Sequence, residues 1–94
     1  MDKEPVERKV MQVHEHLTAT QELPVERTAS RWIGEAEAIT DDIVGTEADS
    51  AVIHRRLSHV VDLLDNVDTT GNETADEHVM AAIEVAREVV DSAD

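Results

Sequence analysis

Apolar residues recur along this chain at alternating spacings of four and three residues, in four separate windows. On an α-helix this spacing gathers the apolar side chains on one face, whereas a half-buried strand alternates apolar and polar residues. The windows begin at Val6, Val25, Ile53 and Ala75. The pattern predicts four amphipathic helices, over about residues 5–19, 24–44, 47–66 and 75–92, and no strands.

Residues at the predicted helix ends support these boundaries. Pro24 is expected in the first turn of the second helix, where its missing N–H has no helical partner to lose. Gly45 is expected to close that helix in a left-handed conformation. Two starts fit a capping box, in which a hydroxyl accepts from a first-turn N–H and an acid three residues later reaches back: Thr74 with Glu77, and Thr46 with Asp49.

The predicted connections are short, and short connections make neighbouring helices antiparallel. Helices of about 18 to 20 residues are about 27 to 30 Å long at 1.5 Å per residue, so the four are matched for packing side by side. We therefore predict an all-α fold, an antiparallel four-helix bundle-like domain, with residues 1–94 forming a single domain.

The third predicted helix carries apolar residues outside its main stripe, at Val52, Val61 and Leu63. A second subunit could cover this additional strip, so a homodimer is expected, with Arg55 and Arg56 pairing to acids at the rim of the contact. Two alternatives stay open. The strip can simply flank an ordinary core seam, and the arginines can neutralise acids on adjacent helices or hold an anion.

The charge of the chain is strongly unbalanced, because 22 Asp and Glu residues accompany only 8 Lys and Arg residues and give a net charge of -14 at pH 7. Molar salt shortens the screening length to about 3 Å and removes most of the resulting repulsion. A halophilic protein with an acidic surface is expected. Binding to nucleic acid or to an anionic membrane depends on clustered Lys and Arg, so neither is expected as a partner.

No apolar run fits a signal peptide or approaches the roughly 20 residues of a membrane span, so the expected location is cytoplasmic. The chain contains no cysteine, which excludes disulfides, thiolate metal sites and cysteine nucleophiles.

Trp32 is the single aromatic residue and lies on the apolar stripe of the second predicted helix, next to Arg31. The interpretation we favour is that it fills core space that Val and Ala leave. The alternative is a ligand contact, in which Arg31 and Trp32 form a platform and Gly34 lets another backbone approach.

The histidines do not form a metal site by their spacing. His14 and His16 are two residues apart and point about 200° apart on a helix, so they cannot hold one ion together. His59 and Asp62 have a usable spacing but supply only two ligands. We predict no metal and no cofactor. The sequence also contains no activated-serine elbow and no glycine-rich phosphate loop, so no catalytic residues are expected and the protein is not expected to be an enzyme.

Four segments together resemble a group of small acidic haloarchaeal proteins known only as a domain of unknown function: Glu22–Val25, Ala29–Ala38, Val67–Asn72 and Ala75–Val79. The resemblance covers about residues 17–90. It implies a halophilic archaeal source and a cytoplasmic setting, and it brings no activity, cofactor or site residues.

The function expected from the sequence is that of a structural or protein-interaction module without catalysis, acting as a homodimer or with another protein. The alternative is a helical bundle that binds a small molecule or a metal ion, with a ligand that the sequence does not identify.

Overall fold

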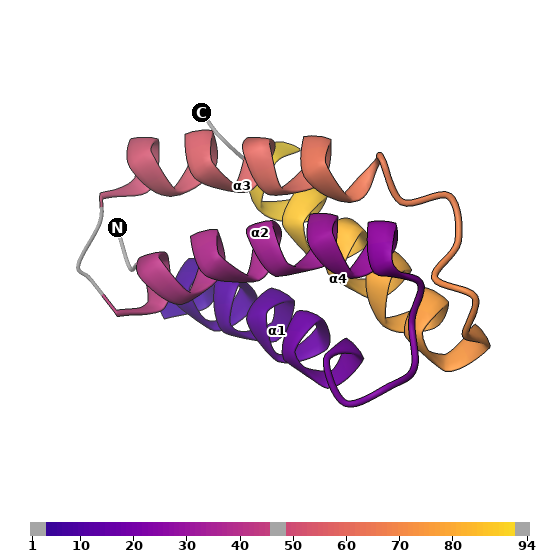
Figure 1. The fold of residues 1–94 in the computed structure, drawn as a ribbon. Helices are drawn as coiled ribbons and strands as arrows, with labels where there is room; N and C mark the ends of the chain where they lie inside the picture. Colours follow the sequence, from indigo (N-terminus) through magenta and orange to yellow (C-terminus); the bar gives the residue numbers. More distant parts are fainter. Residues whose placement is uncertain (1–3, 46–48, 92–94) are drawn as a thin grey trace.

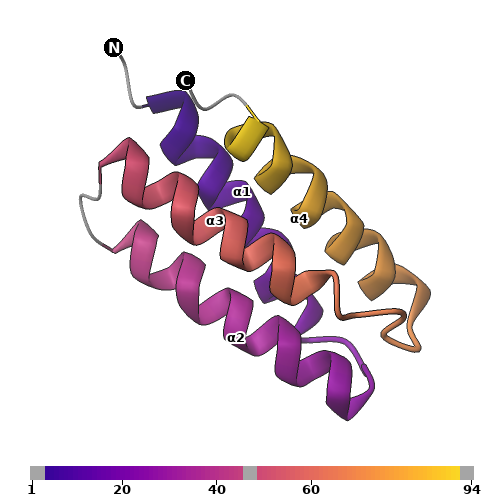
Figure 2. The same ribbon diagram turned by 90° about the horizontal axis from the view of Figure 1, so that it is seen from above.

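The computed structural model describes residues 4–45 and 49–91, which form four α-helices and no strand (Figure 1). α1 spans Glu4–Thr20, α2 spans Arg27–Val44, α3 spans Ser50–Leu64 and α4 spans Glu73–Asp91. α1 packs against α2 and α4, and α3 packs against the same two helices. Successive helices run in opposite directions (Figure 2). The prediction of an all-α, antiparallel four-helix arrangement is confirmed.

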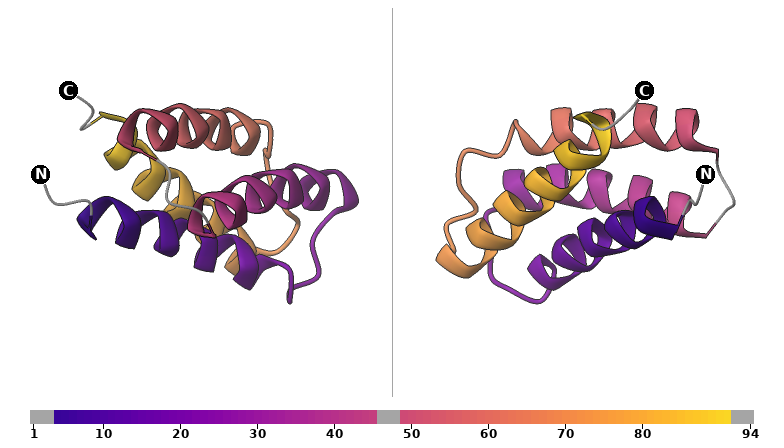
Figure 3. Two further views of the ribbon diagram at one scale, coloured as in Figure 1. Left: turned by 90° about the vertical axis from the view of Figure 1, so that its left-hand side faces the viewer. Right: turned by 180° about the vertical axis from the view of Figure 1, so that it is seen from behind.

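The connections place two loops at one end of the bundle. The α1–α2 and α3–α4 loops lie together at the end opposite the start of α1 and the end of α4, as Figures 2 and 3 show. The backbone N–H of Glu26, just before α2, donates to the carbonyl oxygen of Thr70 in the α3–α4 loop at 2.8 Å. This hydrogen bond joins two loops that are distant in the sequence.

The core is built from the apolar stripes of all four helices. The largest aliphatic side chains that are fully buried are Leu17 on α1, Ile33 on α2, and Leu57 and Leu64 on α3. Smaller Val and Ala residues fill the space between them, and α4 contributes only Val and Ala to the fully buried set. No described helix is both long and apolar enough to cross a membrane.

The bounds of α2 and α3 differ from the predicted ones by two to three residues. α2 begins at Arg27, so Pro24 and Val25 lie in the preceding loop, and Glu26 is extended with φ -60° and ψ 148°. α3 ends at Leu64, so Val67 lies in the loop that follows. There the side-chain amide of Asn66 donates to the carbonyl oxygen of Asp62 at 2.9 Å and satisfies a group that the helix end leaves open. Ala93, expected on the last stripe, is outside the described residues.

The helix caps also differ from the prediction. Asp49 itself caps α3 by accepting from the N–H of Val52 at 3.0 Å, and Thr46 lies outside the described residues. Asn72, not Thr74, caps α4, because its Oδ1 accepts from the N–H of Ala75 at 3.0 Å. Both acceptors are Asx side chains, which cap at least as well as Thr.

Gly45 is not a left-handed cap, since its φ of -81° and ψ of -6° are right-handed. Within the described residues the positive φ occurs at Gly71, at 81°. Gly71 lies in the α3–α4 loop, where a Cβ would also come within 3.2 Å of Glu26 Cγ. A side chain at this position would therefore be strained by both backbone and packing.

Candidate functional site

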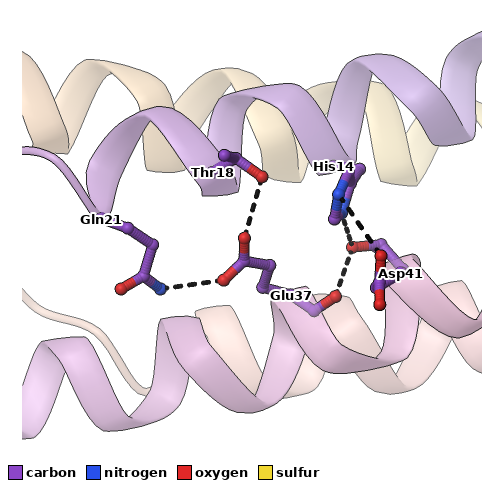
Figure 4. Close-up of polar contacts among 6 residues, drawn as sticks. His14, Thr18, Gln21, Glu37 and Asp41 are labelled. Atoms are coloured by element: carbon purple, nitrogen blue, oxygen red, sulfur yellow. Dashed lines mark hydrogen bonds and ion pairs between the residues drawn. The ribbon is translucent and has the colours of Figure 1, made fainter.

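A row of polar side chains joins α1 to α2 along one face of the bundle (Figure 4). The hydroxyl of Thr18 donates to Glu37 Oε2 at 2.8 Å, and the amide of Gln21 donates to Glu37 Oε1 at 3.1 Å. Both carboxylate oxygens of Glu37 thus accept from the end of α1 and the turn directly after it. These exposed hydrogen bonds connect the two helices in the register that the core packing gives them.

His14 extends this row toward the start of α1. Its Nδ1 lies 3.0 Å from the hydroxyl of Thr40, which is fully buried and donates to the carbonyl of Glu37 at 2.9 Å. With the Thr40 hydroxyl donating to the Glu37 carbonyl, the Thr40 oxygen can accept from His14 in the tautomer that carries its proton on Nδ1. His14 Nε2 is then directed toward Asp41, 3.8 Å from its Oδ1.

A groove with a volume of about 410 Å³ runs above this row of side chains. Its lining residues come from α1 and α2: His14, Thr18, Gly34, Glu37, Ala38 and Asp41. The two small residues, Gly34 and Ala38, are four apart and lie on neighbouring turns of α2. The groove is therefore formed by missing side-chain volume on α2 beside a polar wall from both helices.

None of the packing among the described residues requires a glycine at position 34. It lies in the interior of α2, and a Cβ built on it meets no atom within 4 Å. Glycine inside a helix costs about 0.5–1 kcal/mol relative to alanine. Neither the backbone conformation nor the packing of the described residues requires glycine here, so the open space beside it is available to something outside the chain.

Replacing Gly34 by alanine should therefore stabilise the protein. We expect Gly34→Ala to raise the free energy of unfolding by about 0.5–1 kcal/mol, because the methyl group enters open space and the unfolded chain loses conformational freedom. Urea unfolding followed by circular dichroism in molar KCl measures the change. Ala81→Gly, a change in the interior of α4, should produce a loss of similar size and calibrates the glycine effect.

Two exposed apolar side chains extend the groove toward the start of α1 and the end of α2. Met11 lies three residues before His14 and Val44 three residues after Asp41, which places each about one turn beyond the groove on the same side of its helix. Met11 is 50% exposed and Val44 is 41% exposed. The α1–α2 face therefore combines acidic, small and apolar surface.

Several α3 residues that were predicted to contact a partner already pack or pair within their own chain. Leu63 is buried in the core, and Val61 packs partly against it. Val52 is half-buried, and Arg55 is exposed. Arg56 forms an ion pair with Asp42 of α2 at 2.5 Å. Much of the additional apolar strip is thus covered within the bundle. This agrees with the alternative that the strip flanks an ordinary core seam.

The residues predicted to form a ligand platform are not brought together with Gly34. Arg31 is exposed, while Trp32 is half-buried and packs partly against the core. Trp32 also lines a second cavity, of about 210 Å³, on the side of α2 that faces the α3–α4 loop. The packing of Trp32 against the core agrees with the interpretation that it fills core space. Its contact with a ligand stays a prediction.

Two of the histidines contact each other. His16 on α1 and His78 on α4 bring their Nδ1 atoms to 3.0 Å, so one ring donates and the other accepts. No group of three or more metal-ligating side chains occurs among the described residues. His54 Nε2 is buried and has no hydrogen-bond partner among the described residues.

Asp76, in the first turns of α4, organises the α3–α4 loop. Its Oδ1 accepts from the backbone N–H of Thr70 at 2.7 Å and lies 2.8 Å from the Thr70 hydroxyl, and its Oδ2 accepts from the Thr69 hydroxyl at 3.1 Å. The Thr70 N–H, followed by the Thr70 and Thr69 hydroxyls, lowers the pKa of Asp76 below its ordinary value, against an opposing effect of desolvation. The ionised carboxylate is the form that holds the loop.

This shift predicts a specific loss of stability in acid. Since the folded pKa is lowered, the unfolded chain binds the proton more readily, so the stabilisation is present above the ordinary pKa and is lost as the pH falls through the lowered value. Below about pH 4, the free energy of unfolding of Asp76→Asn should change less steeply with pH than that of the wild type. The difference between the two slopes should correspond to the uptake of at most one proton. Glu77→Gln, one residue further along α4, should leave that slope unchanged. Urea unfolding at several pH values measures both, and equal slopes in the wild type and Asp76→Asn would contradict the assignment.

The fold and the groove define a small acidic helical bundle whose most distinctive surface is an interhelical recess. The chain belongs to the family described as a domain of unknown function, DUF8152, whose model matches residues 9–94. The expectation of a domain of unknown function is thus confirmed. No curated protein and no solved structure matches the chain significantly.

Proposed function

We propose that this domain is a non-catalytic protein-interaction module that binds a basic, amphipathic segment of a partner protein in the α1–α2 groove. The observation that carries the proposal is Gly34. A glycine that weakens its own helix, and that its own chain does not require, is expected where a ligand or partner must approach the helix closely.

The charge of the groove selects the partner. Asp41 is exposed at the groove, Glu37 lines it, and the chain as a whole carries a net charge of -14. Complementary charge favours Lys and Arg on the partner, and like charge suppresses acidic partners, nucleic acid and anionic membranes. Met11 and Val44 then offer apolar contacts one turn away, which an amphipathic segment can cover.

The absence of catalysis is part of the same proposal. The polar side chains at the groove, including His14, Thr18 and Glu37, satisfy one another across the α1–α2 seam. A nucleophile, a base and an oxyanion site would instead have to converge on one open position. The arrangement is better suited to joining helices than to activating a substrate.

Self-association through α3 is the competing interpretation, and the geometry favours it less. Leu63 is buried within its own chain, and Arg56 is already paired with Asp42. The exposed large apolar residues among those described are Met11, Val44 and Met80, none of which lies on α3. A homodimer through Val52, Val61 and Arg55 is therefore the alternative to the groove, and light scattering can detect it.

The proposed setting is the cytoplasm of a halophilic cell. The acidic composition supports it, because molar salt screens the repulsion between the carboxylates. In such a solvent, apolar contacts and close fit contribute more to binding than long-range charge attraction does. This is why the recess beside Gly34 is expected to matter more than the surrounding acids.

The proposal is tested by filling the groove without unfolding the protein. Gly34→Gln places a helix-compatible, uncharged side chain in the open space. A designed amphipathic peptide rich in Lys and Leu should bind the wild type in about 0.5 M KCl and bind Gly34→Gln at least about tenfold more weakly, a loss of about 1.4 kcal/mol. Fluorescence anisotropy of a labelled peptide gives both dissociation constants.

A matched control is Ala51→Gln, which adds the same side chain to an exposed position of α3. It should bind the peptide as the wild type does. Equal binding by Gly34→Gln and the wild type would contradict the proposal, and so would loss of binding in Ala51→Gln alone. Light scattering of the wild type without peptide detects a homodimer directly.

A further inference from the structure

The second cavity lies where the beginning of α2 meets the α3–α4 loop, away from the α1–α2 groove. It has a volume of about 210 Å³, and its lining includes Glu26, Trp32, Asn66, Val67, Asp68 and Thr69. We propose that this cavity binds a small organic cation of the quaternary ammonium type, with the indole of Trp32 and the carboxylates of Glu26 and Asp68 as the recognising groups.

Trp32 supplies the aromatic surface. The side chain is half-buried, so part of the indole packs against the core while part of it lines the cavity. Tryptophan is the side chain that attracts cations most strongly through its ring face, and methylated ammonium groups are the cations best matched to such a surface. The core contact holds the ring in place before a ligand arrives.

Two carboxylates line the same cavity without a partner. Both side chains are exposed, and no hydrogen bond or ion pair joins the Glu26 or the Asp68 carboxylate to another described residue. Glu26 occupies the cap position of α2, yet its side chain does not cap the helix. The α2 dipole alone can favour one acid at Glu26. It does not account for Asp68, which comes from the other loop and shares the cavity with the indole.

The size and charge of the cavity disfavour large ligands and anions. Its volume lies below the roughly 300–1,000 Å³ of pockets that hold drug-sized molecules, so a ligand of only a few heavy atoms fits. Two carboxylates disfavour an anion such as phosphate. Arg31, the nearby basic residue that the sequence suggested, is exposed and does not line the cavity.

The walls of the cavity are fixed by hydrogen bonds. Glu26 N–H donates to the Thr70 carbonyl at 2.8 Å, and Asn66 donates to the Asp62 carbonyl at 2.9 Å. The Thr69 hydroxyl donates to Asp76 at 3.1 Å. Both loops are therefore ordered before binding, which lowers the conformational cost of holding a small ligand.

Choline chloride is a suitable probe, and the single tryptophan reports on its binding. At constant total chloride, with KCl replaced by choline chloride, we expect a saturable change in Trp32 emission with a midpoint in the millimolar range. The neutral isostere 3,3-dimethylbutan-1-ol has the same shape without the charge and should bind at least about fivefold more weakly.

Substitutions at the carboxylates keep the reporter intact. Asp68→Asn and Glu26→Gln should each weaken choline binding by at least about threefold. Asp62→Asn removes a nearby charge outside the cavity lining and should change binding by less than about twofold. Gly34→Gln should leave choline binding unchanged, so failure here is distinguishable from failure of the groove proposal.

Trp32→Leu removes the reporter, so its binding is measured from line broadening of the choline methyl signal by NMR, where the broadening seen with the wild type should disappear. The proposal is overturned if choline and its neutral isostere bind equally, if the emission does not saturate, or if Asp68→Asn and Glu26→Gln both bind choline as the wild type does.

Discussion

Leu57→Ala is expected to lower the free energy of unfolding by about 2–5 kcal/mol. Leu57 is 0% exposed and is one of the few large side chains in a core otherwise filled by Val and Ala. Its removal leaves a cavity that small, close-packed neighbours cannot fill. Since a domain has only about 5–15 kcal/mol of stability, this one change removes a large share of it. Urea unfolding in molar KCl measures the loss.

Two comparisons make the result specific. Leu57→Met conserves volume and should cost less than about 1.5 kcal/mol. Trp32→Ala should cost less than the 3–5 kcal/mol or so of a fully buried tryptophan, because Trp32 is half-buried and borders a cavity. A loss below about 1 kcal/mol for Leu57→Ala would contradict the core described above.

Salt is expected to have the second large effect. Raising KCl from about 0.1 M to about 1 M shortens the screening length from roughly 10 to 3 Å. Because the net charge is -14, we expect the free energy of unfolding to rise by about 2 kcal/mol or more over this range. Ion pairs such as Lys9 with Glu88 at 3.2 Å and Arg87 with Asp65 at 3.5 Å neutralise only a minority of the acids.

The control separates screening of charge from a general effect of salt on apolar burial. Neutralising four exposed acids that have no described partner, by Glu7→Gln, Glu15→Gln, Asp62→Asn and Glu84→Gln, should raise stability at low salt and flatten the salt dependence. Thermal unfolding by circular dichroism at each salt concentration follows both proteins. Equal stability of the wild type in dilute and concentrated KCl would contradict the electrostatic account.

The helices and their core faces could be predicted from the sequence because helical burial repeats locally. A residue such as Leu17 lies on the inner face because its spacing from the other apolar residues places it there. On α2 the spacing placed Trp32 on the inner face, whereas Trp32 is half-buried and Ile33 beside it is the residue that is buried in the core. The helix ends were predicted less well. Asp49 and Asn72 cap α3 and α4, whereas the hydroxyl pattern pointed to Thr46 and Thr74. Several residues near each end can cap, and tertiary contacts decide between them.

The groove depends on contacts that no local pattern contains. The hydrogen bonds from Thr18 and Gln21 to Glu37 join residues 19 and 16 apart, and the register of α1 against α2 sets them. The available signal was the pair of small residues Gly34 and Ala38 on one face of an otherwise regular helix. The sequence suggested that Gly34 allows close approach, but it grouped Gly34 with Trp32, and the structure places the two on different recesses.

The proposed partner surface of this domain is the recess beside Gly34. It is tested most directly by backbone amide chemical shifts of the ¹⁵N-labelled wild type during titration with the Lys- and Leu-rich peptide. The account predicts that the largest shifts fall on His14, Gly34 and Asp41, with smaller ones at Met11 and Val44. Shifts concentrated on Val52, Arg55 and Val61, or no shifts at saturating peptide, would contradict it.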